Sequence, residues 1–261
     1  MPPSEPRTIL ATKGDLSVRL AGGADEIAEA QKLRYHVFFE ELNARPDAAA
    51  AAARIDADRF DGFCDHLIVT RGSDLVGTYR LLPQDVAEVN GGFYTEGEFH
   101  IAPVIASHPN LRFLELGRSC VLKPFRTRPV IELLWQGIWN YVRHHRLDVM
   151  LGCASLEGTD PDRHATTLTF LAQNHAAPPE WRVRALPHRY VEMNRLPAAR
   201  INPGAALKKL PPLIKGYLRL GCYIGEGAVI DQQFNTIDVL IVLPVSAIDA
   251  RYFAHFGQPN G

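Results

Sequence analysis

The sequence lacks several features that would place it in a common class of protein. Its 261 residues include only four cysteines, and no two of them have the C-x-x-C spacing of zinc and redox motifs. The formal net charge is −1, so the chain has no bulk attraction for nucleic acid. The sequence therefore predicts structural thiols in a reducing compartment, no metal site and no nucleic-acid partner. These cysteines are Cys64, Cys120, Cys153 and Cys222.

Long apolar runs are also missing. No window reaches the ~18 uninterrupted apolar residues of a membrane-spanning helix. The first residues, MPPSEPRTILATKGDL, have no apolar core of a secretory signal. We therefore expect a cytoplasmic protein, which leaves open a peripheral position on the inner face of the cytoplasmic membrane.

What is present is a succession of short apolar segments that is typical of an α/β (α+β) fold. The chain, with 46% hydrophobic residues, is long enough for one large domain. We expect a flexible tail over 1–14, one domain over 15–196, and a C-terminal helix-plus-strand extension over 197–261. Strands are predicted at 16–21, 66–70, 75–83, 113–122, 148–156, 189–196 and 234–246. Helices are predicted at 24–42, 129–145, 166–175, 213–231 and 247–257.

The segment FLELGRSCV (113–121) carries a carboxylate and a guanidinium, Glu115 and Arg118, within an otherwise buried strand. In a regular strand, side chains three positions apart point to opposite faces. A single β-bulge would change this relation and would also bend the strand. Such a bulge would splay the sheet and open a slot beside Glu115.

The element order resembles the GNAT acyltransferase fold, with a mixed, splayed central sheet flanked by helices. LRYHVFFEEL (33–42) resembles the Arg-x-x-Val-Phe motif of the acyl-homoserine-lactone and long-chain N-acyl amino acid synthases, and ELGRSCV (115–121) resembles their Glu-x-x-Arg strand. Asp65 falls where those families place an acidic residue. The segment 210–246 is very similar to that of the L-ornithine Nα-acyltransferases of ornithine lipid synthesis, once called hemolysin-like proteins. This closer resemblance covers about residues 15–257.

One GNAT motif is absent. The glycine-rich loop that brings backbone amides close to a pyrophosphate is replaced by KPFRTRPV, which has no glycine. We therefore expect no bound cofactor and a donor with one phosphate, the acyl-phosphopantetheine of acyl carrier protein. Its phosphate would lie at the start of a helix, where the helix dipole favours an anion. The predicted donor-binding residues are Lys123, Arg126, Thr127 and Arg128.

The resemblance implies transfer of a 3-hydroxyacyl chain to the α-amine of L-ornithine, which forms lyso-ornithine lipid. Glu115 is the candidate base, provided that burial raises its pKa. Arg118 is the candidate grip on the acceptor carboxylate. For both residues the alternative is a structural ion pair, with Asp65 as one partner for Arg118. Asp65 pairs either with the ornithine side-chain ammonium or with Arg34.

Further substrate contacts are predicted from Arg34, Phe38 and the strand amides near Val121 and Leu122, which would polarise the thioester carbonyl. We expect direct transfer without a covalent enzyme intermediate. The alternative is acylation of Cys120, but no histidine lies near it in the sequence to activate a thiolate.

Two other functions remain open at this stage. One is that of an acyl-homoserine-lactone or other N-acyl amino acid synthase, although the long C-terminal extension argues against the shorter signal synthases. The other is a non-catalytic membrane-binding protein, since 200–221 has the basic amphipathic pattern of a helix on an anionic bilayer. The same segment equally fits a helix that packs on the domain with its lysines in solvent.

Overall fold

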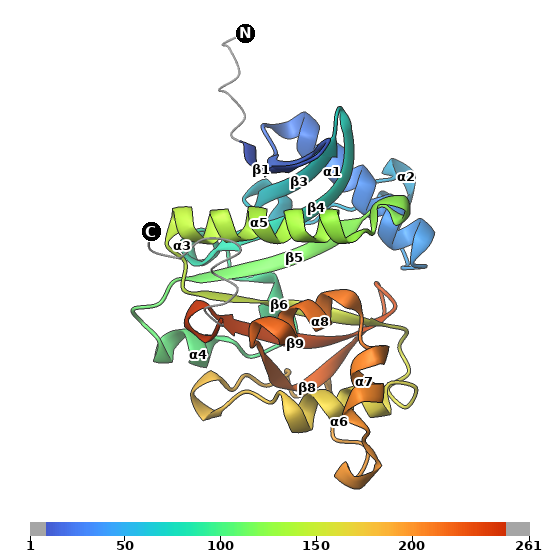
Figure 1. Cartoon of the computed structure of the whole chain (residues 1–261), viewed down its shortest axis with the longest axis vertical. Helices are drawn as coiled ribbons and strands as arrows, with labels where there is room; N and C mark the ends of the chain where they lie inside the picture. Colours follow the sequence, from blue (N-terminus) through green and yellow to red (C-terminus); the bar gives the residue numbers. More distant parts are fainter. Residues whose placement is uncertain (1–8, 249–261) are drawn as a thin grey trace.

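The computed structural model describes residues 9–248. Within them, nine strands form one sheet in the order β1-β2-β3-β4-β5-β6-β9-β8-β7 (Figure 1). Neighbouring strands are antiparallel except for β5 and β6, which are parallel. The predicted mixed sheet is therefore confirmed. The strands are β1 (Ile9–Lys13), β2 (Leu16–Leu20), β3 (Asp65–Arg71), β4 (Asp74–Pro83), β5 (Phe113–Val121), β6 (Val149–Glu157), β7 (Tyr190–Val191), β8 (Tyr223–Asp231) and β9 (Thr236–Pro244).

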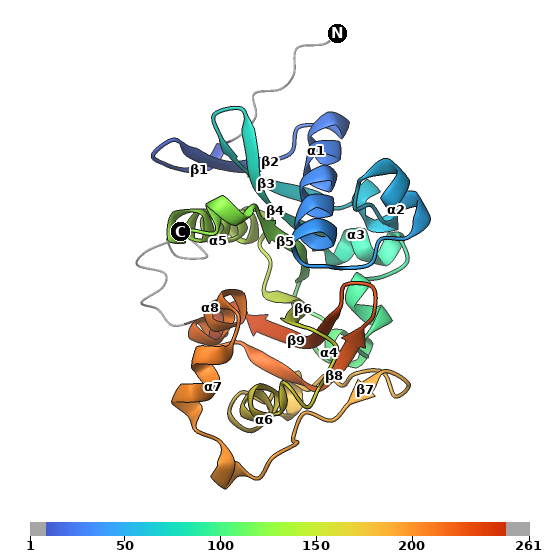
Figure 2. The same cartoon turned by 90° about the vertical axis from the view of Figure 1, so that its right-hand side faces the viewer.

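Helices cover both faces of the sheet. Helices α5 and α8 lie on one face and α1 lies on the other (Figure 2). The α-helices are α1 (Ala24–Tyr35), α2 (Ala48–Ala53), α3 (Gln84–Val89), α4 (Ala102–Ser107), α5 (Arg128–His145), α6 (Ala165–Asn174), α7 (Pro203–Lys209) and α8 (Pro212–Leu220). A π-helix, η1 (His36–Glu41), continues α1, and the 3₁₀ turns are η2 (Arg59–Gly62), η3 (Tyr94–Gly97), η4 (Lys123–Phe125), η5 (Pro179–Trp181), η6 (Ala198–Arg200) and η7 (Val245–Ala247). No helix within residues 9–248 is long and apolar enough to cross a membrane.

Three element predictions differ from the structure. The helix predicted over 213–231 ends at Gly221, whose φ of 89° suits a left-handed helix cap, and the apolar residues beyond it form β8. The strand predicted over 189–196 is reduced to Tyr190–Val191. The predicted tail 1–14 contains β1, because Ile9–Lys13 pairs with β2. The helix predicted over 247–257 lies almost wholly outside the described residues.

The C-terminal segment belongs to the sheet itself. Strand β9 pairs with β6 along its whole length, from Val149 opposite Pro244 to Glu157 opposite Thr236. Its residues Val239, Leu240 and Val242 are completely buried. The segment predicted as an extension packed on the domain therefore completes the hydrophobic core.

The sheet is open between β5 and β6. The two strands pair only from Phe113 to Glu115, although β5 continues to Val121 and β6 to Glu157. In β5, two residues, Arg118 and Ser119, lie opposite a single residue of β4, and Arg118 has a φ of 51°. The predicted bulge and the predicted parting of strands at Glu115 are both present.

Candidate active site

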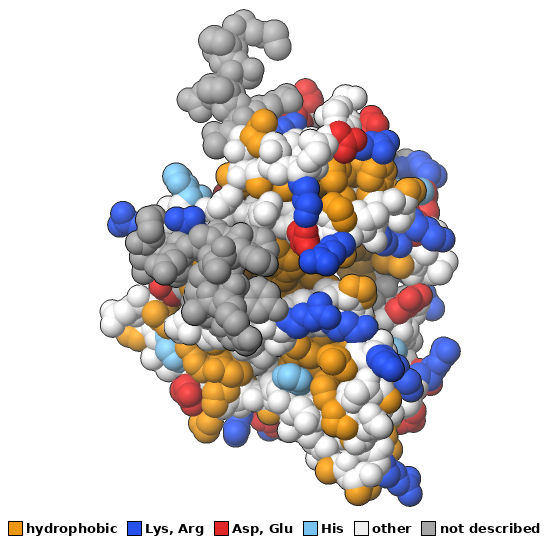
Figure 3. Space-filling view, viewed as in Figure 1, with side chains coloured by type: hydrophobic (Ala, Val, Ile, Leu, Met, Phe, Trp, Pro, Cys, Tyr) orange, Lys and Arg blue, Asp and Glu red, His pale blue; other side chains and the backbone are white. Residues whose placement is uncertain are grey.

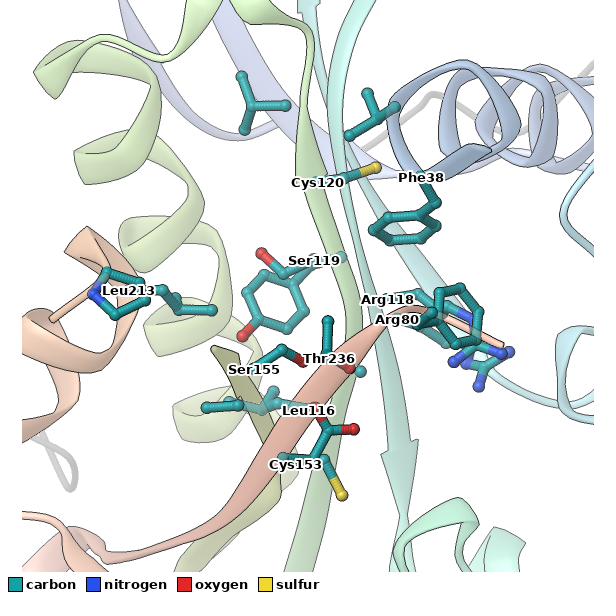
Figure 4. Close-up of a pocket in the computed structure, with 18 of the residues that line it drawn as sticks. Phe38, Arg80, Leu116, Arg118, Ser119, Cys120, Cys153, Ser155, Leu213 and Thr236 are labelled. Carbon is teal, nitrogen blue, oxygen red and sulfur yellow. The ribbon is translucent and has the colours of Figure 1, made fainter. Parts of the chain in front are cut away.

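A pocket of about 500 Å³ passes through the opening between β5 and β6. Phe38 and Leu213 line it from opposite sides of β5 (Figure 4). On the side of α5 and α8 the lining is apolar and includes Leu134, Trp135 and Ile138. The same face of the molecule shows a hydrophobic recess bordered by Lys and Arg side chains (Figure 3). The pocket thus joins an apolar slot on one face of the sheet to a polar end on the other.

Glu115 stands at the point where the strands part, and it lines the pocket. Its carboxylate accepts the amide hydrogens of Tyr94 at 3.0 Å and Thr95 at 2.7 Å. The residue is only 5% exposed, and this burial raises its pKa above the usual range. Backbone amides therefore hold the carboxylate in place. The alternative role of Glu115, a structural ion pair, would have required an arginine at this position.

Arg118 also lines the pocket, and it is ion-paired. Its Nε lies 3.2 Å from Asp56 and its Nη2 lies 3.0 Å from Asp58. The guanidinium carbon lies 4.9 Å from the ring centre of Tyr94 and 4.6 Å from that of Phe234. Two carboxylates and two aromatic faces therefore fix its position. The ion pair considered for Arg118 is present, but its partners are not Asp65.

Arg34 belongs to the same ionic network but not to the pocket lining. It is 1% exposed, and both terminal nitrogens lie 2.8 Å from the carboxylate of Asp61. Arg80, which does line the pocket, lies 2.6 Å from Asp58 and 3.3 Å from Asp61. Two buried arginines and the half-buried Arg118 are thus matched by three aspartates, which is the condition for keeping such charges away from water.

The candidate residues predicted from the sequence do not include the aspartates of this network. The segment RIDADRFDG (54–62) supplies every carboxylate of the network, from its aspartates at 56, 58 and 61. Its alternating aspartates were the available signal. Nothing local, however, shows that this segment folds back onto α1, β4 and β5.

Two other predicted residues lie elsewhere among the described residues. Asp65 begins β3, and its carboxylate accepts the Tyr141 hydroxyl at 2.6 Å, outside the pocket lining. The amide of Leu122 donates to the Val76 oxygen at 3.0 Å, so it is not available to a thioester carbonyl. The prediction of an oxyanion contact from Leu122 is therefore wrong, while Val121 does line the pocket.

The basic turn after β5 lies at the surface. Lys123, Arg126, Thr127 and Arg128 are all exposed, and of these Arg126 lines the pocket. Arg126 donates from Nε to the Val121 oxygen at 2.9 Å and is ion-paired with Glu41. The turn leads directly into α5, so its cations border both a pocket and a helix N-terminus.

The cysteines are unpaired, as predicted. Cys120 lines the pocket, but it is 6% exposed, and this burial raises the pKa of its thiol. Burial likewise raises the pKa of Cys153. Both groups are therefore poor nucleophiles at neutral pH, which supports transfer without an acylated cysteine.

A second group of carboxylates was not foreseen. Glu98, Asp231 and Asp238 are buried, and one oxygen from each lies within 4.8 Å of the others. Asp231 and Asp238 line the pocket on its polar side. The three oxygens are close enough together to hold a cation. The sequence had predicted no metal site and gave no sign of this group.

Comparison with known proteins identifies close relatives. Residues 33–136 match the family described as "Acetyltransferase (GNAT) domain". The chain is 51% identical to L-ornithine N(alpha)-acyltransferase of Agrobacterium fabrum, covering 94% of this chain and 86% of that protein. It is 50% identical to the enzyme of the same name from Brucella abortus, covering 95% of this chain and 91% of that protein. The solved structure of FeeM, an N-acyl amino acid synthase from uncultured soil microbes, superimposes with a TM-score of 0.47 at 11% identity, over 88% of this chain and 91% of that one.

Proposed function

Since this chain belongs to the family of L-ornithine N(alpha)-acyltransferases, we propose that it transfers a 3-hydroxyacyl chain from acyl carrier protein to the α-amine of L-ornithine. The product is lyso-ornithine lipid. The observation that carries the proposal is the parting of β5 and β6 at Glu115, which joins an apolar slot to a polar, charged end of one pocket.

The acyl chain occupies the apolar slot between α5 and α8. Leu134, Ile138 and Leu213 supply the kind of surface that buries a hydrocarbon chain, at roughly 25 cal/mol for each Å² removed from water. The thioester then lies in the gap between the strands, and the acceptor lies on the other face. This placement brings an amine and a thioester together at Glu115.

Glu115 takes the proton of the acceptor. An α-ammonium has no lone pair, so it must lose a proton before the nitrogen attacks the thioester carbon. A buried carboxylate with a raised pKa is a suitable acceptor, directly or through one water. The nitrogen attacks the thioester carbon to form the new C–N bond, and it then loses its second proton to water. The C–S bond breaks, and the proton held by Glu115 passes to the departing phosphopantetheine thiolate, so one proton is released to solvent in each turnover.

Arg118 binds the acceptor carboxylate at the polar end. Its guanidinium is fixed by Asp56 and Asp58 and by two aromatic rings, and it lies along the same strand as Glu115. A positive group held this rigidly loses little entropy when it binds a carboxylate. Arg80 lines the same part of the pocket and adds to the positive potential.

The basic turn receives the donor. All four predicted residues are exposed: Arg126 lines the pocket, Lys123 and Thr127 lie in the same turn, and Arg128 begins α5. A phosphate at this position gains from the cations and the helix dipole, and an acidic carrier protein gains from the cations alone.

A cytoplasmic enzyme that works against the inner face of the membrane would release its lipid product directly. Lys208, Lys209 and Arg219 are exposed on α7 and α8, beside the apolar slot. Helix α8 is itself packed on the sheet, because Ile214 and Tyr217 are buried and the Tyr217 hydroxyl lies 2.7 Å from that of Tyr79. Membrane contact would therefore use the exposed cations, and stronger sedimentation with anionic than with neutral vesicles would test it.

An acyl-transfer assay tests the function itself. Purified protein receives 3-hydroxyacyl carrier protein and one amino acid at a time, and mass spectrometry identifies the products. We expect the N-acyl product with L-ornithine in preference to the other amino acids. Efficient acylation of a different amino acid would show another N-acyl amino acid synthase, and no acylation of any acceptor would contradict the proposal.

A further inference from the structure

We propose that Glu98, Asp231 and Asp238 bind the side-chain ammonium of the acceptor and so select a diamino acid over a neutral one. This inference rests on the proposed function and names the part of the pocket that recognises the acceptor side chain. We call the three residues the acidic cluster.

The acidic cluster is assembled from three separate parts of the chain. Glu98 follows η3, Asp231 ends β8, and Asp238 lies within β9. They are 2%, 7% and 5% exposed, so the cluster is closed to bulk solvent except through the pocket that Asp231 and Asp238 line. A charged group that reaches these carboxylates therefore does so from the acceptor side of the pocket.

A short chain of contacts connects the acidic cluster to the proposed base. Glu115 accepts the amide hydrogen of Thr95, whose hydroxyl lies 3.9 Å from the Cys153 sulfur. The Cys153 thiol in turn donates to Glu98 at 3.2 Å, and Cys153 is among the lining residues drawn in Figure 4. Cys153 is thus the link between Glu115 and the acidic cluster, and the side chain of an amino acid with its α-amine at Glu115 would extend along Cys153 toward the cluster.

The acidic cluster has more negative charge than its surroundings compensate. One cation contacts it among residues 9–248: Arg189, whose Nη1 lies 3.5 Å from Glu98. Asp231 Oδ1 accepts the amides of Gln233 and Phe234. Asp238 Oδ1 is buried, and it has no hydrogen-bond partner within the part of the chain that the structure describes. A buried carboxylate oxygen left unpaired is costly, and a bound cation would relieve that cost.

The titration of these groups is consistent with a missing cation. Burial and the neighbouring carboxylate charges raise the pKa of Glu98 to about 7 and that of Asp238 to about 6. An ammonium ion donates three hydrogen bonds, which suits three carboxylates that converge on one point. A divalent metal would satisfy the same oxygens, but the proposed acceptor itself brings an ammonium group into this pocket.

Acceptor competition tests the inference. L-norvaline has the carbon chain of L-ornithine without its side-chain amine. Wild-type protein, Asp238→Asn and Glu98→Gln each receive both acceptors in one reaction, and the ratio of the two acylated products gives the ratio of kcat/KM. We expect each variant to lower the ornithine-to-norvaline ratio by ~100-fold, because a buried carboxylate partner is lost. The control is Glu88→Gln, which removes an exposed carboxylate on α3 and should keep the wild-type ratio.

The outcomes separate this inference from the proposed function. If wild-type protein acylates ornithine but the variants lose both acceptors in the same proportion, the acidic cluster is structural and the inference fails while the function stands. If wild-type protein acylates no acceptor, the proposed function itself fails. Two variants are used so that the test still works if one of them misfolds. Thermal unfolding of each variant checks that it is folded.

A metal ion is the remaining alternative. Wild-type protein is dialysed against a chelator and assayed again, with and without Mg²⁺ or Ca²⁺. An unchanged product ratio supports the ammonium site. A ratio that collapses on chelation and returns with the metal alone would overturn it.

Discussion

The backbone oxygen of Leu116 lies so close to Gly152 that a Cβ built on this glycine would be only 2.2 Å from it. Leu116 is the first residue of β5 beyond the last pair with β6, and Gly152 is the corresponding residue of β6. The two strands therefore remain in close contact at the very place where their hydrogen bonding ends. Because Gly152 has no side chain, β5 and β6 can lie this close together beside the opening of the pocket.

Replacing Gly152 by alanine should push the two strands apart. We expect Gly152→Ala to lower the free energy of unfolding by about 1–3 kcal/mol, because the new methyl group meets backbone that cannot move freely. Urea denaturation measures this change. Gly62→Ala is the matched control, since a Cβ there meets no atom within 4 Å. Equal free energies of unfolding for the two variants would show that the backbone at Leu116 can move to make room for the methyl group.

Replacing Glu115 by glutamine should remove the proposed base. We expect Glu115→Gln to lower kcat by at least ~100-fold, the lower end of what a general base contributes. The variant should remain folded although less stable, because glutamine has the shape of glutamate and keeps an oxygen for one of the two amides, those of Tyr94 and Thr95, and loses the other hydrogen bond. Circular dichroism checks the fold, and single-turnover acyl transfer measures the rate. Wild-type turnover by a folded variant would eliminate Glu115 as the base.

The basic turn should affect the donor more than the acceptor. We expect Arg126→Ala combined with Arg128→Ala to raise the KM for acyl carrier protein about tenfold, because two cations at the pocket edge are lost. The KM for the amino acid should change much less. Arg182→Ala, which removes another exposed arginine, serves as the control. A carrier KM equal to that of the control would rule out docking at the turn.

The acidic cluster should make stability depend on pH. The folded protein holds the Glu98 proton more tightly than the unfolded chain does, since the pKa of Glu98 rises from 4.5 to about 7. This contribution is complete below pH 4.5 and is lost as the pH rises through 7. We therefore expect the free energy of unfolding to fall by on the order of 2–3 kcal/mol from pH 5 to pH 8, in the absence of an acceptor.

Urea denaturation of wild type and of Glu98→Gln at both pH values checks this prediction. The variant lacks the titrating group, so its decrease should be smaller, while Glu88→Gln should retain the wild-type decrease. The prediction would be contradicted if the free energy of unfolding of the wild type increased from pH 5 to pH 8. It would also be contradicted if Glu98→Gln showed the same decrease as the wild type.

Most of the framework and the centre of the pocket were predictable from the amino-acid sequence. Apolar periodicity located β3 to β6 and helices α1, α5 and α6, because burial on one face imposes a regular spacing on each element. A carboxylate and an arginine three positions apart in β5 predicted a bulge and a parting of strands, and both are present. Glu115, Arg118 and Phe38, which the motifs singled out, line one pocket, and their roles there stay predictions.

Which distant charged residues contact one another could not be predicted without the folded structure. The partners of Arg118 lie at Asp56 and Asp58, and the acidic cluster combines Glu98 with residues of β8 and β9. Local periodicity reports whether a side chain is buried, but not which segment packs against it. That choice depends on strand register and on how loops fold over the sheet, so the balance of charge around the site exists only in the assembled chain.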